Sequence, residues 1–238
     1  KRAFDLAVRE PQKYPNLAKG IWEQVRNILL ATKTVEEARA WIDDLPNDAE
    51  WRAYRRINEG RLQVIDGRMP PAEEIQGLPS HKILAVRRKH LEEAIRIFES
   101  LAAESPAGLP NVEVTRELAR AYVFLADIDQ AQHTTALRKA EQNFQALIKA
   151  APQDLMAHLE LTGVYLKQGQ AAEALVLLNQ AQEKWPNSEQ VLLAKARVLE
   201  IKSDRSEAIK VRLAIRDKQP KNVDNLLALA SLYEASGQ

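Results

Sequence analysis

The sequence predicts an all-α fold in which helices pack as antiparallel pairs. Only 8 of the 238 residues are Gly, and residues that favour helix, such as Ala, Leu, Glu, Gln, Arg and Lys, are abundant along the chain. Three prolines, Pro152, Pro186 and Pro220, each follow an apolar helical pattern and stand 34 residues apart. Upstream of each proline a small residue recurs, with further seam residues four and seven positions later: Ala140, Phe144 and Leu147; Ala174, Leu178 and Ala181; Ala208, Arg212 and Ile215.

This spacing has a direct structural meaning. A small residue lets two antiparallel helices approach closely, and residues four and seven positions later lie on the same helix face and fill the seam. Proline then ends the second helix, because it lacks a backbone N–H and clashes with the preceding turn. A period of this length is the sequence signature of a stacked helical repeat.

The segment 155–188 resembles a tetratricopeptide repeat. The slots that define that family hold His158, Leu161–Thr162, Tyr165, Gly169, Ala174, Leu178, Ala181 and Pro186. His158 stands where the family has Trp, and Thr162 stands where it has Gly. The resemblance implies a TPR-like α-solenoid, that is, a right-handed superhelix of antiparallel helix pairs, with about 11–12 helices in this chain.

The pattern divides the segment 111–238 into hairpins at about 112–154, 155–188 and 189–222, with a partial hairpin at 223–238. We expect the chain to continue beyond Gln238 as part of a longer protein, because the sequence stops after one helix of a pair. The hairpin at 112–154 is about nine residues longer than the others. We assign these residues to its connection, with Asp127 and Asp129 in the loop and Thr134–Thr135 at the next N-cap.

The segment 1–110 is expected to hold degenerate TPR-like hairpins that continue the same solenoid. One pair falls between Trp22 and Leu45. Another joins a helix at about 49–66 to a second helix that carries Ala94, Phe98 and Leu101 and ends at Pro106. Between these two lies an irregular loop near 67–80, which is too rich in Gly and Pro to be one helix.

The composition excludes several classes of function. A net charge of +1 gives no global attraction to nucleic acid or membrane, and no apolar run reaches the length of a membrane span. Cysteine is absent, the four histidines lack metal-ligand spacing, and no phosphate loop or nucleophile motif occurs, so we predict no cofactor, no metal and no enzymatic activity. The compartment is unknown: cytoplasm is the default, and export to the periplasm stays open because the sequence begins at Lys1.

In tetratricopeptide arrays the first helices line a concave groove, and the resemblance carries five groove slots onto each hairpin here. The candidate partner-binding residues in those slots are Arg52, Arg56, Arg116, Arg120, Phe124, Leu159, Leu166, Lys167, Leu193 and Arg197. An arginine stripe followed by apolar patches fits an extended or helical partner segment with acidic and apolar residues. The alternative is that these arginines pair with acids of the chain itself, such as Glu59, Glu113 and Glu117.

The leading function is a non-catalytic protein-interaction scaffold, expected to be the repeat module of a larger bacterial protein. The first alternative is a targeting or regulatory arm of a larger enzyme or of a polysaccharide or secretion assembly. The second is RNA binding by helical repeats. The locally basic stretch 51–90 favours it, but the acids within that stretch and the lack of a repeated base-contacting set argue against it.

Overall fold

A computed structural model describes residues 39–40, 42, 49–104 and 111–237 of the chain. The described residues form ten α-helices and contain no strand, so the predicted all-α fold is confirmed. The chain divides into two compact units, Lys1–Ser105 and Pro106–Gln238. Most of the predicted N-terminal hairpin at 22–45 lies outside the described residues. Among the described helices, none has both the length and the apolar character that crossing a membrane requires.

In the first unit, α4 (Ala49–Arg68) packs against α6 (Ser80–Ala103). The three predicted seam residues of α6, Ala94, Phe98 and Leu101, are all buried. Two glycines of α4 allow close packing: a Cβ on Gly60 would lie 2.7 Å from the Phe98 ring, and one on Gly67 would lie 2.5 Å from Leu91 Cγ.

The irregular segment between α4 and α6 is shorter than predicted, because α4 runs on to Arg68. It contains the single-turn helix α5 (Ala72–Ile75). This helix is tied to α6 by the His90 ring, whose Nε2 lies 2.8 Å from a carboxylate oxygen of Glu74. The other ring nitrogen lies 2.7 Å from the side-chain oxygen of Gln63 on α4.

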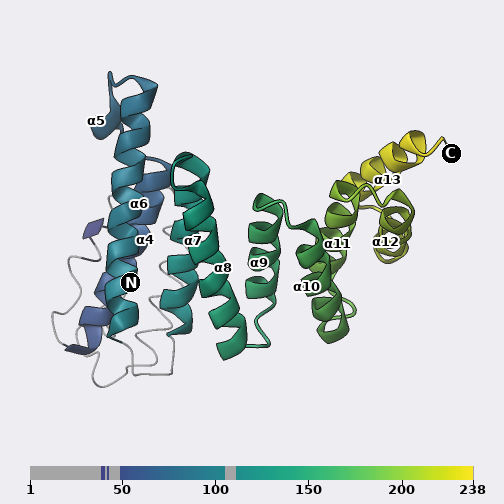
Figure 1. Cartoon of the computed structure of the whole chain (residues 1–238), viewed down its shortest axis with the longest axis horizontal. Helices are drawn as coiled ribbons and strands as arrows, with labels where there is room; N and C mark the ends of the chain where they lie inside the picture. Colours follow the sequence, from purple (N-terminus) through teal and green to yellow (C-terminus); the bar gives the residue numbers. More distant parts are fainter. Residues whose placement is uncertain (1–38, 41, 43–48, 105–110, 238) are drawn as a thin grey trace, which may run out of the picture. The chain divides into compact units, whose positions relative to one another are not determined.

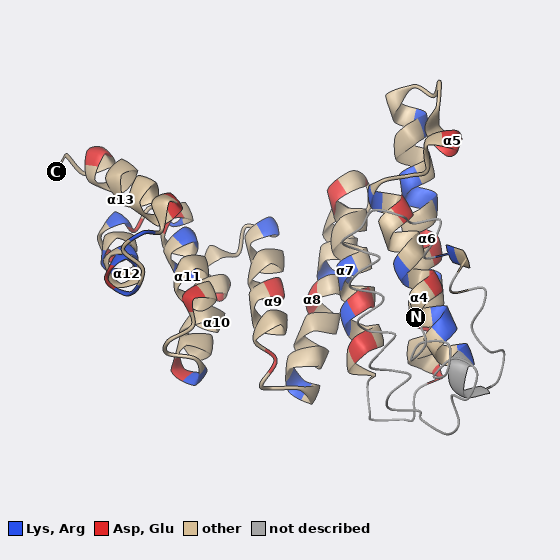
Figure 2. Cartoon of the chain, turned by 180° about the vertical axis from the view of Figure 1, so that it is seen from behind, with Lys and Arg blue, Asp and Glu red and all other residues tan. Residues whose placement is uncertain are grey.

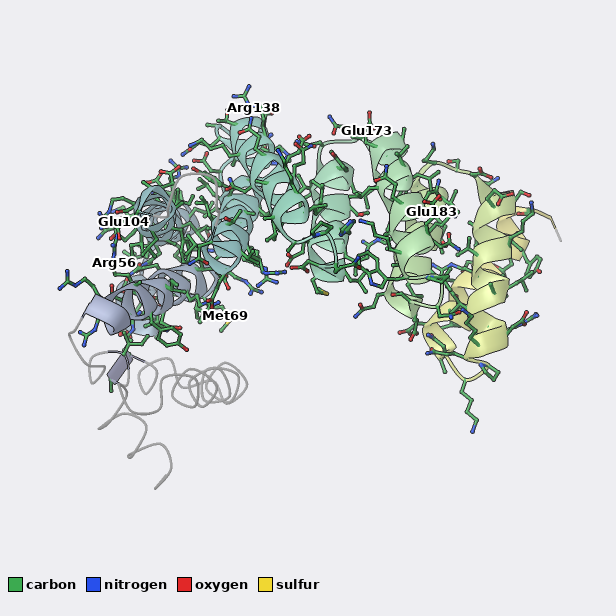
Figure 3. All side chains as sticks on the ribbon, turned by 90° about the horizontal axis from the view of Figure 1, so that it is seen from below. Arg56, Met69, Glu104, Arg138, Glu173 and Glu183 are labelled. Atoms are coloured by element: carbon green, nitrogen blue, oxygen red, sulfur yellow. The ribbon has the colours of Figure 1, made fainter. Side chains whose placement is uncertain are left out.

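The second unit is a row of paired helices (Figure 1). The pairs are α7 (Val112–Ile128) with α8 (His133–Ala150), α9 (Leu155–Lys167) with α10 (Ala171–Lys184), and α11 (Glu189–Ile201) with α12 (Arg205–Lys218). The final described helix, α13 (Val223–Ala235), stands in the position of the first helix of a further pair and packs on α12. Viewed from below, Arg138 on α8 and Glu173 on α10 lie along the same edge of this row (Figure 3).

Local signals place the ends of these helices. Side chains of Asn111, Asp154, Ser188, Asp204 and Asn222 each accept a hydrogen bond from a backbone N–H of the following first turn. The chain leaves α9, α11 and α13 through residues in the left-handed conformation, namely Gly169, Ser203 and Gly237, which again stand 34 residues apart.

The predicted seam residues are buried, and one of them is charged rather than apolar. Ala140, Ala174 and Ala208 are fully buried, and so are Phe144 and Leu178 four positions after the first two. The equivalent residue in the third pair is Arg212, which is only 8% exposed. A charged side chain is therefore buried where the other two pairs place large apolar ones.

The prediction of a long connection after α7 is wrong. Only residues 129–132 join α7 to α8, and α8 begins at His133 rather than after Thr134–Thr135. The extra length extends the helices instead: α7 has 17 residues and α8 has 18, against 13 and 14 in α9 and α10. Asp129 stabilises the short turn, because its carboxylate accepts hydrogen bonds from Ala131 N and from the Gln132 side chain.

Candidate functional site

The predicted site residues of the second unit lie on α7, α9 and α11, which are the first helices of their pairs. Besides packing on its own partner α10, α9 contacts α11, so these successive first helices lie side by side. We use the term first-helix face for the surface formed by the family's groove slots on α7, α9, α11 and α13. Its members considered below are Arg116, Arg120, Phe124, Met156, Leu159, Gly163, Leu166, Lys167, Leu193, Arg197, Ile201 and Leu227.

At the α7–α9 part of this face, ion pairs join the two helices. Arg116 pairs with Asp154, which also caps α9. Arg120 donates to Glu160 at 2.6 Å from Nε, and Lys167 Nζ lies 2.5 Å from Asp127. The two arginines and Lys167 are therefore partnered by acids of the chain itself. Most of these acids differ from those proposed from sequence, although Glu117 does lie 3.8 Å from Arg120.

Burial and pairing shift the pKa values of this group in opposite directions. Burial alone would raise the pKa of Asp154, but hydrogen bonds from Arg116 and from the Ala157 backbone outweigh it and hold that pKa below its usual value. Burial raises the pKa of Glu160, and the charge of Arg120 only partly offsets this effect. One carboxylate oxygen of Glu160 is buried without a hydrogen-bond partner, with Arg116 Nη1 3.9 Å away.

The α9–α11–α13 part of the face has a different character. Helix α9 carries only two charged residues, Glu160 and Lys167, and is otherwise uncharged (Figure 2). Leu159 and Leu166 are half-buried against the apolar cluster that joins α9, α10 and α11, and Leu193 is half-buried on α11. Phe124 is half-buried on α7.

Three exposed apolar side chains extend this part beyond the ten candidate residues. Met156 is 45% exposed on α9, Ile201 55% on α11 and Leu227 63% on α13. Each occupies a groove slot of its repeat, and the slot pattern of the complete hairpins already includes Met156 and Ile201. The part of the face formed by these helices is therefore more apolar than the part formed by α7.

Arg197 differs from the other arginines of the first-helix face. It is exposed on α11, and among the described residues it has no ion pair or hydrogen-bond partner. Arg197 is thus an arginine of this face whose guanidinium is open to an external carboxylate.

The remaining two predicted residues belong to the first unit. Arg56 donates to both carboxylate oxygens of Glu104, at 2.6 and 2.8 Å, and to Ser100 Oγ at 2.8 Å. Arg52 is exposed on the preceding turn of α4, and its charge also lowers the pKa of Glu104 after the larger effect of the Arg56 hydrogen bond. These contacts join α4 to the end of α6.

The described residues hold no group of His, Asp and Glu side chains arranged to bind a metal ion. His158 is buried, and its Nδ1 lies 2.8 Å from the Asp154 carbonyl oxygen. Its ring meets the edge of Trp185 with centroids 5.1 Å apart. In the slot where the family has Trp, this histidine therefore fills the seam between α9 and the end of α10.

Comparison with known proteins agrees with this geometry. Residues 135–198, from α8 into α11, match the family model described as tetratricopeptide repeat. This segment of the chain therefore carries tetratricopeptide repeats. A comparison with curated protein sequences finds no match.

Solved structures with a similar fold include proteins described as tetratricopeptide repeat proteins. The match to one from Parabacteroides merdae spans 100% of this chain and 75% of that protein, at 14% identity and a TM-score of 0.58. YrrB, described as a TPR protein with an unusual peptide-binding site, covers 95% and 97% at 18% identity and a TM-score of 0.52. MamA from Desulfovibrio magneticus RS-1 covers 66% and 83% at 19% identity and a TM-score of 0.51. At these identities the likeness shows the fold alone.

Proposed function

We propose that this chain is a non-catalytic scaffold that binds a segment of a partner protein on the first-helix face of α9, α11 and α13. The segment is extended or helical, and it carries apolar side chains and at least one carboxylate. The observation that carries the proposal is that exposed Met156, Ile201 and Leu227 occupy groove slots on three first helices of one array, and that an unpaired Arg197 occupies another slot of the same set. Exposed apolar groups gathered beside a polar anchor are typical of a recognition surface.

The charges support this location over the α7 part of the face. An incoming carboxylate would have to displace Asp154 from Arg116 or Glu160 from Arg120, whereas Arg197 has no such competitor among the described residues. Arginine binds a carboxylate through two parallel hydrogen bonds, which gives orientation as well as affinity. We therefore assign Arg116 and Arg120 mainly to joining α7 and α9, and Arg197 to the partner.

A displayed library of short random peptides, selected against the chain, provides the test. Enriched peptides should combine apolar residues with Asp or Glu. A synthetic copy should bind the wild type at least about tenfold more tightly than it binds Ile201→Asp or Leu227→Asp, because a buried unpaired charge opposes contact with an apolar segment. Arg197→Glu should weaken the binding of the same peptide to a similar extent.

The matched control is Val176→Asp. Val176 is a branched aliphatic residue like Ile201, is 58% exposed, and lies on α10, the second helix of its pair. It should leave peptide affinity unchanged. Equal binding to all four variants, or a library from which no peptide is enriched, would refute the proposed function.

A further inference from the structure

Among the described residues, the structure explains every glycine but one, and it does so for one of two reasons. Gly77, Gly169 and Gly237 have positive φ angles that other residues adopt only with strain. Gly60 and Gly67 sit where a Cβ would collide with Phe98 or Leu91 of the neighbouring helix. Gly163 shows neither feature: it lies within α9, and no atom of another part of the chain comes within 4 Å of a Cβ placed on it.

Glycine at such a position is unfavourable for the free chain. Inside a helix it is less stabilising than alanine, because its backbone loses more freedom on folding and it adds no side-chain contact. Any small side chain at 163 would enter open space. The fold of the chain alone therefore gives no reason for glycine here, whereas a molecule that must approach the backbone of α9 closely does.

The surroundings of Gly163 define what would approach. Leu159 lies one turn before it and Leu166 one turn after it on the same helix face, and both are half-buried. The Cβ position of Gly163 is thus uncovered between two leucines, and we use the term pit for this position. Because glycine has no side chain, this position leaves space for the end of a large apolar side chain, which would contact both leucines.

The repeat places a charge beside this pit. Arg197 stands 34 residues after Gly163, so it occupies the same slot on α11 that Gly163 occupies on α9, and these two helices are in contact. The charged residues of α9 itself are already engaged, Glu160 by Arg120 and Lys167 by Asp127. Arg197 is therefore the charge next to the pit that remains for a ligand.

We propose that a large apolar side chain of the partner seats on Gly163 between Leu159 and Leu166, while a nearby carboxylate of the same segment binds Arg197. This inference rests on the proposed function and specifies the recognition element: an aliphatic or aromatic residue with Asp or Glu close to it in the bound segment. Glycine at 163 makes the pit deep enough to hold the apolar side chain.

The test uses variants that change stability and affinity in opposite directions. Gly163→Ala should raise the melting temperature of the chain by about 2–4 °C, because alanine favours helix. The same change should weaken binding of the synthetic peptide selected above, and Gly163→Leu should weaken it by about tenfold or more while the chain stays folded. A loss of affinity in a more stable protein cannot arise from unfolding.

The matched control for added bulk is Ala172→Leu, at an exposed position of the second helix α10, which should leave affinity unchanged. The carboxylate is tested by exchange of charge: Arg197→Glu should prefer a peptide in which Asp or Glu is replaced by Lys. If Gly163→Leu binds as tightly as wild type while Ile201→Asp does not, the pit is refuted and the scaffold function stands. If neither variant affects binding, the proposed function fails with it.

Discussion

Replacing Arg212 by leucine should destabilise the chain, even though leucine restores the repeat pattern. Arg212 occupies the slot that holds Phe144 and Leu178 in the preceding pairs, and it donates to Glu200 on α11 and to Asn225 Oδ1 on α13, the latter at 3.1 Å. Asn225 in turn donates to the Arg212 carbonyl at 3.0 Å. It is 1% exposed, in the slot that holds Ala157 and Val191 in the preceding first helices.

The expected magnitude follows from what the substitution leaves behind. In Arg212→Leu the buried Asn225 Oδ1 loses its donor, which costs about 1–3 kcal/mol. Glu200 contributes less, because its side chain is 29% exposed and water can solvate it. Asn225→Val in the same background removes the orphaned group and restores an apolar seam. The double variant should therefore equal or exceed the wild type, since buried ionic groups replaced together by apolar ones are often neutral or stabilising by about 1–4 kcal/mol.

The assay is urea unfolding followed by circular dichroism for the wild type, Arg212→Leu, Asn225→Val and the double variant. A coupling energy of about 1–3 kcal/mol between the two positions is expected. Val176→Ala combined with Ser231→Ala, at two exposed positions on different helices, serves as an additive control. The reasoning is refuted if Arg212→Leu alone is more stable than the wild type, or if the two effects simply add.

Three further predictions concern single residues of the second unit. Asp154→Asn keeps the cap of α9 but removes the charge that pairs with Arg116, so unfolding at neutral pH should become easier by about 1 kcal/mol. Because the pKa of Asp154 is lowered in the folded chain, its contribution is present above the ordinary value of 3.8 and is lost as the pH falls through the lowered pKa. A pH series of urea unfolding should therefore show a steeper acid-side loss in the wild type than in the variant, and parallel curves would contradict this. The pH dependence caused by Glu160 has the opposite sign. Burial raises the pKa of Glu160, so the wild type loses stability as the pH rises from the ordinary value of 4.5 through the raised pKa. Glu160→Gln should flatten that decline, and a variant with the wild-type slope would show that Glu160 is not its source. Ser203→Gly should stabilise the chain by roughly 0.5–1 kcal/mol, because Ser203 has φ of 60° where Gly169 and Gly237 have the same left-handed conformation without a side chain. Thermal melting measures this gain, with Ser231→Gly on the exposed side of α13 expected to lose stability instead.

Much of the candidate site could be located from sequence, because the repeat period carries slot identity from one hairpin to the next. The same slots that nominated Leu159, Leu193 and Arg197 also include Met156 and Ile201, which are exposed. Sequence could not reveal which arginines are open to a ligand. Arg116 and Arg120 find their acids 38 and 40 residues away, on the next first helix, so their pairing depends on how two hairpins stack.

Glycine illustrates the same limit. Helix propensity treats every glycine within a helix as equally unfavourable, and three of the described glycines lie inside α4 or α9. Only the packed structure distinguishes Gly60 and Gly67, which are pressed against α6, from Gly163, which faces open space. The distinction matters because the fold explains the first two, whereas the third is the glycine that the proposed contact with a partner would explain.

The sequence by itself determined the helical class, the seam of small and bulky residues, and the family resemblance. These features depend on local propensity and on a 34-residue period that recurs from one hairpin to the next. The tertiary structure decided that α7 and α8 are longer helices joined by residues 129–132. It also gave the buried Arg212 its partners Glu200 and Asn225, and it left Arg197 unpaired among the described residues. The physical reason is that burial and ion pairing belong to contacts between hairpins, where residues far apart in the chain share one low-dielectric interface.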